Sequence, residues 1–183
     1  MPEPCTLLTD RLVLRPFRAH DAPVVRHLAG DRAIADTTIN IPHPYLDGMA
    51  ERWIQSHETQ WQEGLAAVFA IDRLEDRQLI GAVGLRLNPV HDRAELGYWI
   101  GRPFWGCGYC TEAARAVVTF GFRTLGLRRI HATHFTRNPA SGRIMQKIGM
   151  RPEGVLRRHV RKWDVFEDLA VYGLLRDEFE PGA

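Results

Sequence analysis

The sequence predicts an α/β fold in which a mixed central sheet of about six to seven strands carries helices on both faces. The length of 183 residues favours one domain over residues 1–183. A hydrophobic content of 45% with 25% charged residues is typical of a folded globular protein. Apolar patterns of strand and helix period alternate along the chain in the order β α α β β β α β α β β, which favours a mixed sheet over a purely parallel one.

The first third of the chain is predicted to hold one strand and two helices. Apolar residues predict a strand over 12–17, and a helix is expected over 20–30. Residues 31–46 are expected to be irregular because their prolines exclude a regular helix. Asp47 is the expected N-cap of a second helix, over 49–64.

The remaining elements alternate between strands and helices. Gly126 is expected at the C-terminal cap of one helix, and Asn138 at the N-cap of the next. The predicted strands are 66–72, 79–87, 94–100, 129–135, 151–160 and 165–175. The predicted helices are 110–125 and 139–148.

Composition excludes several classes of protein. The 24 basic and 22 acidic residues differ by only two charges, which gives little support to a nucleic-acid binder. No apolar run approaches the 18 or so residues that a membrane span needs, and no secretory signal is visible. The three cysteines are too few for a disulfide framework. We expect a cytoplasmic protein with reduced thiols and without nucleic-acid or membrane partners.

The glycine-rich turn over 101–108 is the most informative segment. A strand ends there and a helix begins, so freed backbone N–H groups and the helix dipole can face an anion. A Walker loop is absent, and Gly106-x-Gly108 is followed by Thr111, which does not complete a dinucleotide fingerprint. Taken alone, the glycines are also compatible with a tight turn between strand and helix.

Five motifs in register resemble the GNAT acetyltransferases, specifically the Rim-type protein N-terminal acetyltransferases and their relatives. The resemblance covers residues 7–178. The motifs are Thr9-Asp10-Arg11-Leu12-x-Leu14-Arg15, Ala94-Glu95-Leu96-Gly97-Tyr98-Trp99-Ile100, Trp105-Gly106-Cys107-Gly108-Tyr109-Cys110-Thr111-Glu112, Asn138-Pro139-Ala140-Ser141 with Lys147-Ile148-Gly149-Met150, and Gly154-x-Leu156-Arg157 with Asp168 and Tyr172-x-Leu174-Leu175-Arg176.

The resemblance implies acetyl-CoA as cosubstrate, an amine as acceptor, and no metal. Trp99 and Ile100 would pair with the pantetheine arm, Asn138 would hydrogen-bond it, and Arg143 would lie near the phosphates. The pyrophosphate would bind the backbone amides of Trp105, Gly106, Cys107, Gly108, Tyr109 and Cys110.

The resemblance also implies two catalytic residues. Glu95 matches the position of a general base, and its alternative role is a surface carboxylate paired with Arg93 or Arg86. Many relatives protonate the departing thiolate with a Tyr, but Met145 stands at that position here. Ser141 is the nearest donor at a matched position. Alternatively, its hydroxyl hydrogen-bonds within the first turn of its own helix, and water supplies the proton to the thiolate.

Two other constellations are less favoured. Cys107 and Cys110 form a Cys-x-x-Cys, but His131 and His134 sit at an odd separation on a predicted strand, which places them on opposite faces and opposes a zinc site. A redox role for the cysteine pair stays open. The basic segment 157–162 lacks an aromatic ladder, so a solvated edge or a contact with an acidic substrate is favoured over RNA.

The acceptor amine is the open question. The Rim-type resemblance favours a protein N-terminal α-amine, acetylated by direct attack in a ternary complex. Antibiotics, polyamines and amino acids are alternative acceptors, and a non-catalytic acetyl-CoA sensor is a further alternative. Residues 31–50 and 160–167 are expected to frame the acceptor site. The sequence leaves the oligomeric state open, with a homodimer among the alternatives.

Overall fold

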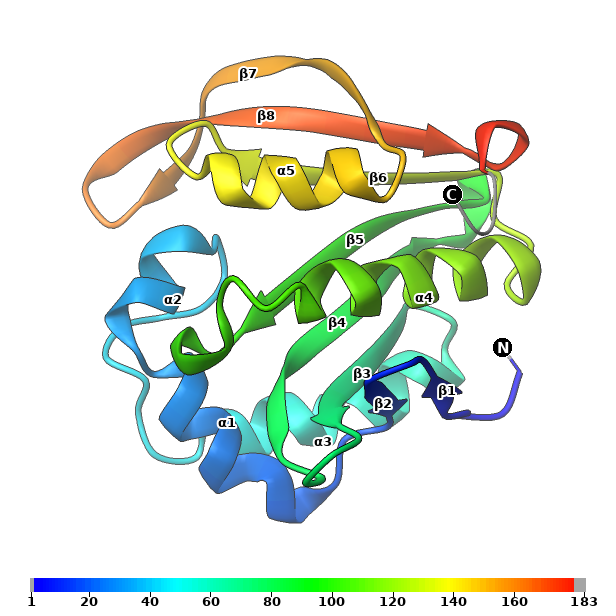
Figure 1. The fold of residues 1–183 in the computed structure, drawn as a ribbon. Coiled ribbons are helices and arrows are strands. Elements are labelled where there is room, and N and C mark those ends of the chain that lie inside the picture. Colours follow the sequence, from blue (N-terminus) through cyan, green and yellow to red (C-terminus); the bar gives the residue numbers. More distant parts are fainter. Residues whose placement is uncertain (1, 180–183) are drawn as a thin grey trace.

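A single twisted sheet runs through the molecule (Figure 1), as the computed structural model shows for residues 2–179. Its strand order is β1-β2-β3-β4-β5-β6-β8-β7. The strands are β1 (Leu7–Leu8), β2 (Leu12–Arg15), β3 (Ala66–Arg73), β4 (Leu79–Asn88), β5 (Arg93–Ile100), β6 (Arg129–Phe135), β7 (Arg151–Lys162) and β8 (Val165–Leu175). The helices are α1 (Ala22–Ala29), α2 (Arg32–Thr37), α3 (Met49–Gln62), α4 (Tyr109–Arg123) and α5 (Pro139–Lys147).

Helices cover both faces of the sheet, as the sequence predicted. Val117 and Val118 of α4 join buried residues such as Phe69 of β3 in the larger core. On the other face, Val25 of α1 and Ile54 of α3 pack with Ala70. No helix within residues 2–179 is both long and apolar enough to span a membrane.

Within the described residues, only β5 and β6 are parallel neighbours, and they separate after three residue pairs. β5 and β6 are in register at Arg93 with Arg129, Ala94 with Ile130 and Glu95 with His131. Beyond these pairs β5 continues to bond β4 and β6 continues to bond β8. Residues 96–100 and 132–135 therefore present two facing edges, called the open edges below, whose backbone polar groups do not pair with each other.

Three local predictions need correction. The sheet has eight strands because the two-residue strand β1 adds to the predicted count. Residues 32–37 form α2 in the segment expected to be irregular, because the prolines lie beyond them and Asp31 accepts from the Ala33 amide at 2.8 Å. Asp47 does not cap α3. Gly48 takes that position at φ 77°, and Asp47 pairs with Arg26 instead.

The closing hairpin also differs from a regular ladder. A bulge between Leu156 and Val160 interrupts the alternation expected for the basic segment. Arg158 sits in this bulge at φ 49°, and its amide donates to Asp168 Oδ1 at 2.7 Å. At the tip, Lys162 pairs with Val165, so Trp163 and Asp164 make a two-residue turn.

Candidate active site

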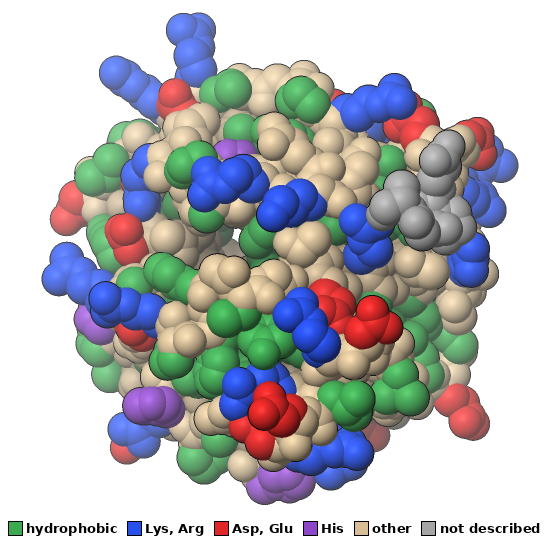
Figure 2. All heavy atoms as spheres, viewed as in Figure 1, with side chains coloured by type: hydrophobic (Ala, Val, Ile, Leu, Met, Phe, Trp, Pro, Cys, Tyr) green, Lys and Arg blue, Asp and Glu red, His purple; other side chains and the backbone are tan. Residues whose placement is uncertain are grey.

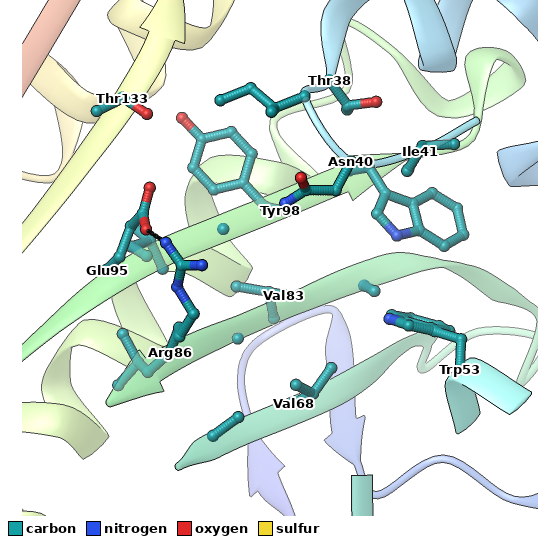
Figure 3. Close-up of a pocket in the computed structure, with 18 of the residues that line it drawn as sticks. Thr38, Asn40, Ile41, Trp53, Val68, Val83, Arg86, Glu95, Tyr98 and Thr133 are labelled. Atoms are coloured by element: carbon teal, nitrogen blue, oxygen red, sulfur yellow. Dashed lines mark hydrogen bonds and ion pairs between the residues drawn. The ribbon is translucent and has the colours of Figure 1, made fainter. Parts of the chain in front are cut away.

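A central cavity of about 1070 Å³ lies against the sheet where β5 and β6 separate. Strands β3 to β8 contribute its floor, and the segment 38–45 with α1 and α3 contributes its walls (Figure 3). Both segments expected to frame an acceptor site therefore contribute to it, the second through Val160. Among its charged lining residues are Arg52, Arg86 and Glu95.

Glu95 projects from β5 into the central cavity. Its antiparallel partner on β4 is Arg86, whose Nη2 contacts Glu95 Oε2. Glu95 is thus a strand carboxylate paired with Arg86 and not with Arg93, and it also lines a cavity. The carboxylate oxygen that is not bonded to Arg86 points toward the side of the cavity where Tyr98 and Thr133 lie (Figure 3).

His131 is the residue of β6 in register with Glu95, and it lines the same cavity. Its Nδ1 is buried and has no hydrogen-bond partner in the described part of the chain. Burial lowers the pKa of His131, and the nearby Glu95 carboxylate partly opposes that shift. The imidazole is therefore neutral near pH 7. The sequence pattern pointed to His131 only as a metal ligand and gave no sign of its place beside Glu95.

A hydrogen-bonded pair joins β5 to α5. Tyr98 Oη lies 2.9 Å from Ser141 Oγ and donates to the Ser141 carbonyl at 3.1 Å. Burial raises the pKa of Tyr98, so the phenol keeps its proton over the physiological range. Met145, by contrast, is buried in the core. Sequence reasoning selected Ser141 but missed Tyr98, because the pair is 43 residues apart and no local pattern joins them.

The glycine loop, residues 101–108, leads from β5 into α4. Gly106 and Gly108 adopt φ 77° and 81°, and Gly108 is the N-cap of α4. In the part of the chain that the structure describes, the amides of residues 106–111 donate to no protein acceptor. These amides and the N-terminal end of the 15-residue helix form a cradle suited to an anion such as pyrophosphate.

The surface beside this loop is also suited to phosphate. Figure 2 shows a hollow between α5 and the N-terminal end of α4, with Lys and Arg side chains over α5 above it. Arg143 and Lys147 are exposed residues of α5. Asn138 caps α5 by accepting from the Ser141 amide at 3.4 Å, which confirms the predicted cap.

An ion-paired network that the sequence did not predict fixes the glycine loop. Glu112, in the first turn of α4, accepts from Thr9 Oγ1 at 2.7 Å and from the Arg11 amide at 2.9 Å. The Arg11 guanidinium bonds Glu112 and the Cys107 carbonyl, and it lies 4.7 Å from the centre of the Tyr109 ring. These residues are about 100 positions apart, so their meeting depends on the fold and not on a local motif.

The end of β5 approaches the same loop. Trp105 donates its indole N–H to the Ile100 carbonyl at 2.6 Å. That carbonyl therefore keeps one lone pair for a further donor, such as an amide of a pantetheine arm. Trp99 is oriented to the opposite face, where it lines the central cavity with Trp53.

The side chains of Cys107, Cys110 and His134 do not form a metal site. Cys107 and Cys110 are both free, and burial raises the pKa of the Cys110 thiol to about 12. His131 lines the central cavity, whereas His134 is buried on the other face of β6 beside Gly142, as the odd spacing predicted. No cluster of three His, Cys, Asp or Glu within residues 2–179 is arranged for a metal ion.

Comparison with known proteins identifies this architecture. The profile of the acetyltransferase (GNAT) domain matches residues 11–151. The uncharacterised N-acetyltransferase YoaA of Bacillus subtilis is 33% identical over 171 residues, which are 93% of this chain and 96% of that protein. The ribosomal-protein-serine acetyltransferase of Escherichia coli is 27% identical over 160 residues, 86% of this chain and 88% of that protein.

A solved structure agrees in fold. RimL, a ribosomal L7/L12 α-N-protein acetyltransferase in complex with coenzyme A, superposes with a TM-score of 0.85 at 18% identity, covering 92% of this chain and 96% of that one. The open parallel strand pair and the glycine loop at a helix N-terminus define an acyl-CoA-dependent acyltransferase. The chain belongs to the GNAT acetyltransferase family, and its relatives confirm the Rim-type resemblance.

Membership establishes the coarse activity. The protein is an acetyl-CoA-dependent N-acetyltransferase, and acetyl-CoA is its cosubstrate. The residues present fit that cosubstrate, because the open edges, the positive-φ glycines and the unpaired amides of residues 106–111 offer matching donors and acceptors.

Proposed function

We propose that the protein acetylates the α-amine of a protein N-terminus, by direct attack of that amine on acetyl-CoA in a ternary complex. The charge of the central cavity carries this proposal. Among residues 2–179 its lining contributes one carboxylate, Glu95, against Arg52 and Arg86, and Glu95 is already paired with Arg86. An acceptor with a single amine is compatible with this cavity, whereas a polyamine or an aminoglycoside would bring several ammonium groups to a wall with one paired carboxylate.

The similarity to ribosomal-protein acetyltransferases supports the same acceptor class. Amine chemistry agrees with it. An α-amino group of pKa about 7.8 is ~14% neutral at pH 7, while a lysine of pKa about 10.4 is only ~0.04% neutral. A larger fraction of an α-amine is therefore already neutral, so it depends less than a lysine on deprotonation by the one ion-paired carboxylate of the cavity. The cavity volume of about 1070 Å³ is large enough to admit several residues of an extended peptide.

The catalytic roles follow from position. Glu95 accepts the ammonium proton, directly or through water, before the amine attacks the thioester carbonyl. Collapse of the tetrahedral intermediate then expels the thiolate on the α5 side of β5, where Tyr98 and Ser141 supply a hydrogen-bond donor. The attacking nitrogen loses its remaining surplus proton to water as the amide forms. Ser141 is thereby the expected partner of the leaving group, and Tyr98 holds its hydroxyl at 2.9 Å.

The cosubstrate would lie along the open edges and the glycine loop. We assign the pyrophosphate to the amides of residues 106–110 and the pantetheine arm to the end of β5 at Trp99 and Ile100. The Trp105 amide, which the sequence had included, donates to the Arg102 carbonyl at 3.2 Å and is left out of this assignment. Asn138 retains an amide N–H₂ that its cap interaction does not use, and this group is the proposed donor to the arm. Exposed Arg143 would contact the phosphates from α5.

Thiol release from acetyl-CoA over a panel of amines tests the proposal. The panel holds peptides with free N-termini, lysine peptides with blocked N-termini, a polyamine and an aminoglycoside. We expect turnover with the free N-termini and at most weak turnover with the others. Efficient turnover confined to the polyamine or the aminoglycoside would refute the proposed acceptor. Stabilisation by acetyl-CoA without turnover of any amine would favour a sensor.

A further inference from the structure

We propose that Arg86 is a specificity-determining residue and that the preferred acceptors carry a carboxylate close to their primary amine. This inference rests on the proposed function only in placing the acceptor in the central cavity. It assigns to the same cavity a subsite for an anion, built on the residue that neutralises Glu95 in the free protein.

Arg86 has unused hydrogen-bonding capacity. It lies on β4 directly opposite Glu95, and its side chain is 75% exposed. A guanidinium carries five N–H donors in a planar fork. Among the residues that the structure describes, Glu95 is its one hydrogen-bond or ion-pair partner, through a single nitrogen. Figure 3 shows the guanidinium at the cavity, within reach of a ligand placed beside Glu95.

The ion pair between Arg86 and Glu95 hinders an acceptor that has an ammonium group but no carboxylate. An ammonium that approaches Glu95 also approaches the positive charge of Arg86, which repels it. Unless something else pairs with Arg86, the ammonium has to compete with the guanidinium for the same carboxylate. No other Asp or Glu lines the cavity within the described residues, so the protein itself supplies no replacement anion.

An acidic acceptor resolves the competition by exchange of partners. Its carboxylate binds Arg86, in a two-pronged geometry that the guanidinium fork favours. Its ammonium then binds Glu95. One ion pair in the free protein becomes two in the complex, and Glu95 is released from Arg86 at the moment when it has to accept a proton. The exchange therefore couples recognition of the acceptor to exposure of the base.

Two kinds of acceptor share this chemistry. One is a protein N-terminus with an acidic side chain at its second residue, and the other is a free amino acid through its own α-carboxylate. The cavity volume of about 1070 Å³ exceeds what a single amino acid fills, which favours the peptide. The experiment includes both sources.

The test compares peptides with Ser at the N-terminus, Glu, Gln or Lys in second place, and an amidated C-terminus. For the wild-type protein we expect kcat/KM to be at least about tenfold higher for the Glu peptide than for the Gln peptide, and lowest for the Lys peptide. Arg86→Ala should make kcat/KM equal for the Glu and Gln peptides, and Arg86→Glu should give the highest kcat/KM with the Lys peptide. Arg123→Ala, which removes an exposed arginine at the end of α4 away from the cavity, should keep the wild-type ratio.

The ratio separates recognition from a structural role. If Arg86 only holds Glu95 in place, its loss lowers turnover of all peptides equally and leaves the wild-type preference unchanged. Equal turnover of Glu and Gln peptides by the wild-type protein would overturn the inference and leave the proposed function standing. Turnover of free amino acids but not of their amides or of peptides, again dependent on Arg86, would support the inference and refute the proposed function. Where no acceptor turns over, calorimetric binding of the Glu and Gln peptides to the CoA complex decides, and equal affinity overturns the inference.

Discussion

Glu95 belongs to a sequence motif of the family, lies opposite Arg86 in the sheet and lines the central cavity. If it is the base, Glu95→Gln removes the proton acceptor and keeps the side-chain shape. We expect kcat/KM to fall about 10²- to 10⁴-fold. The loss should be largest at low pH, where the acceptor is mostly ammonium, and smallest at high pH, where little deprotonation is needed. A pH–rate profile of the variant measures both.

Binding of acetyl-CoA provides the control for this substitution. The glycine loop lies beyond the other end of β5, so Glu95→Gln should leave the affinity for acetyl-CoA unchanged. Glu58→Gln, at an exposed position of α3, should leave both properties unchanged. A parallel loss of acetyl-CoA binding in the Glu95 variant would indicate a structural role instead of a catalytic one.

Tyr98 and Ser141 are expected to act as one unit. Their hydroxyl oxygens are 2.9 Å apart, and burial keeps the Tyr98 phenol protonated by raising its pKa. Tyr98→Phe and Ser141→Ala should each lower kcat, because each interrupts the supply of a proton or hydrogen bond to the thiolate. The double variant should be no slower than the slower single variant, which single-turnover rates can establish. Fully additive losses would show that the two hydroxyls work independently.

At the residue scale, the features predicted from the sequence are those that depend on neighbouring residues in the chain. The positive φ of Gly106 and Gly108 and the cap at Asn138 follow from residue types and short spacings. The pairs Tyr98–Ser141 and Arg11–Glu112 did not follow, because each joins segments that are remote in sequence.

The glycine loop is the element whose geometry is most directly tied to binding. Gly106 and Gly126 offer a matched comparison, since both have positive φ and neither has an atom within 4 Å of an added Cβ. Gly106→Ala and Gly126→Ala should each cost about 1–2 kcal/mol of stability from the left-handed backbone. Only Gly106→Ala should also weaken acetyl-CoA binding, by about tenfold, equivalent to about 1.4 kcal/mol. Thermal unfolding and calorimetric titration separate the two effects, and equal affinities for the two variants would place the pyrophosphate elsewhere.

Helix α3 contains a histidine that should make stability depend on pH. The centre of the His57 ring lies 4.4 Å from that of Trp53 and 5.3 Å from that of Phe17, and neither ring nitrogen has a hydrogen-bond partner among the described residues. Burial lowers the pKa of His57 to about 4. Unfolded His57 takes up its proton near pH 6.5, so between about pH 6.5 and pH 4 the unfolded state binds more protons. The free energy of unfolding therefore falls as pH drops through this window.

The change expected from this histidine at pH 5 is about 2 kcal/mol relative to pH 7. His57→Leu should remove that part of the acid sensitivity, whereas His27→Gln, at an exposed position of α1, should not. Urea unfolding at pH 7 and pH 5 measures the difference. If the His57 variant keeps the wild-type dependence on pH, the histidine is not the group that titrates.

At the element scale the predictions were accurate where one face of an element is buried. The strands from β3 to β6 and helices α3 to α5 follow regular apolar patterns, and all were predicted close to their positions. Helix α2 was missed because six residues give too short a pattern to stand out. The bulge in β7 was also missed, since most of that strand is exposed and carries no apolar alternation to reveal a register shift.

On the scale of the whole molecule, the sheet is nearly divided at β5 and β6. Three residue pairs join its two parts. Long-range contacts also join the two parts: Arg137 Nη1 lies 3.0 Å from Asp36 Oδ2, and Lys162 Nζ donates to the Ile41 carbonyl at 2.7 Å. Burial lowers the pKa of Lys162, in keeping with its enclosed position. The separation exists because residues 96–100 and 132–135 keep their outer partners and diverge from each other.

A ligand that occupies the open edges should therefore act as the missing strand between the two parts. Acetyl-CoA at 100 times its dissociation constant should add about 2.7 kcal/mol to the free energy of unfolding. Where amide hydrogens exchange through local opening of the structure, bound acetyl-CoA should slow exchange in residues 96–100 and 106–111. Residues 70–72 of strand β3 are the internal control, because β2 and β4 already pair with both of their edges. Slower exchange at β5 and the glycine loop with unchanged exchange at β3 would locate the cosubstrate between the two parts of the sheet, whereas unchanged exchange at β5 in saturating acetyl-CoA would contradict that placement and with it the role of the open edges.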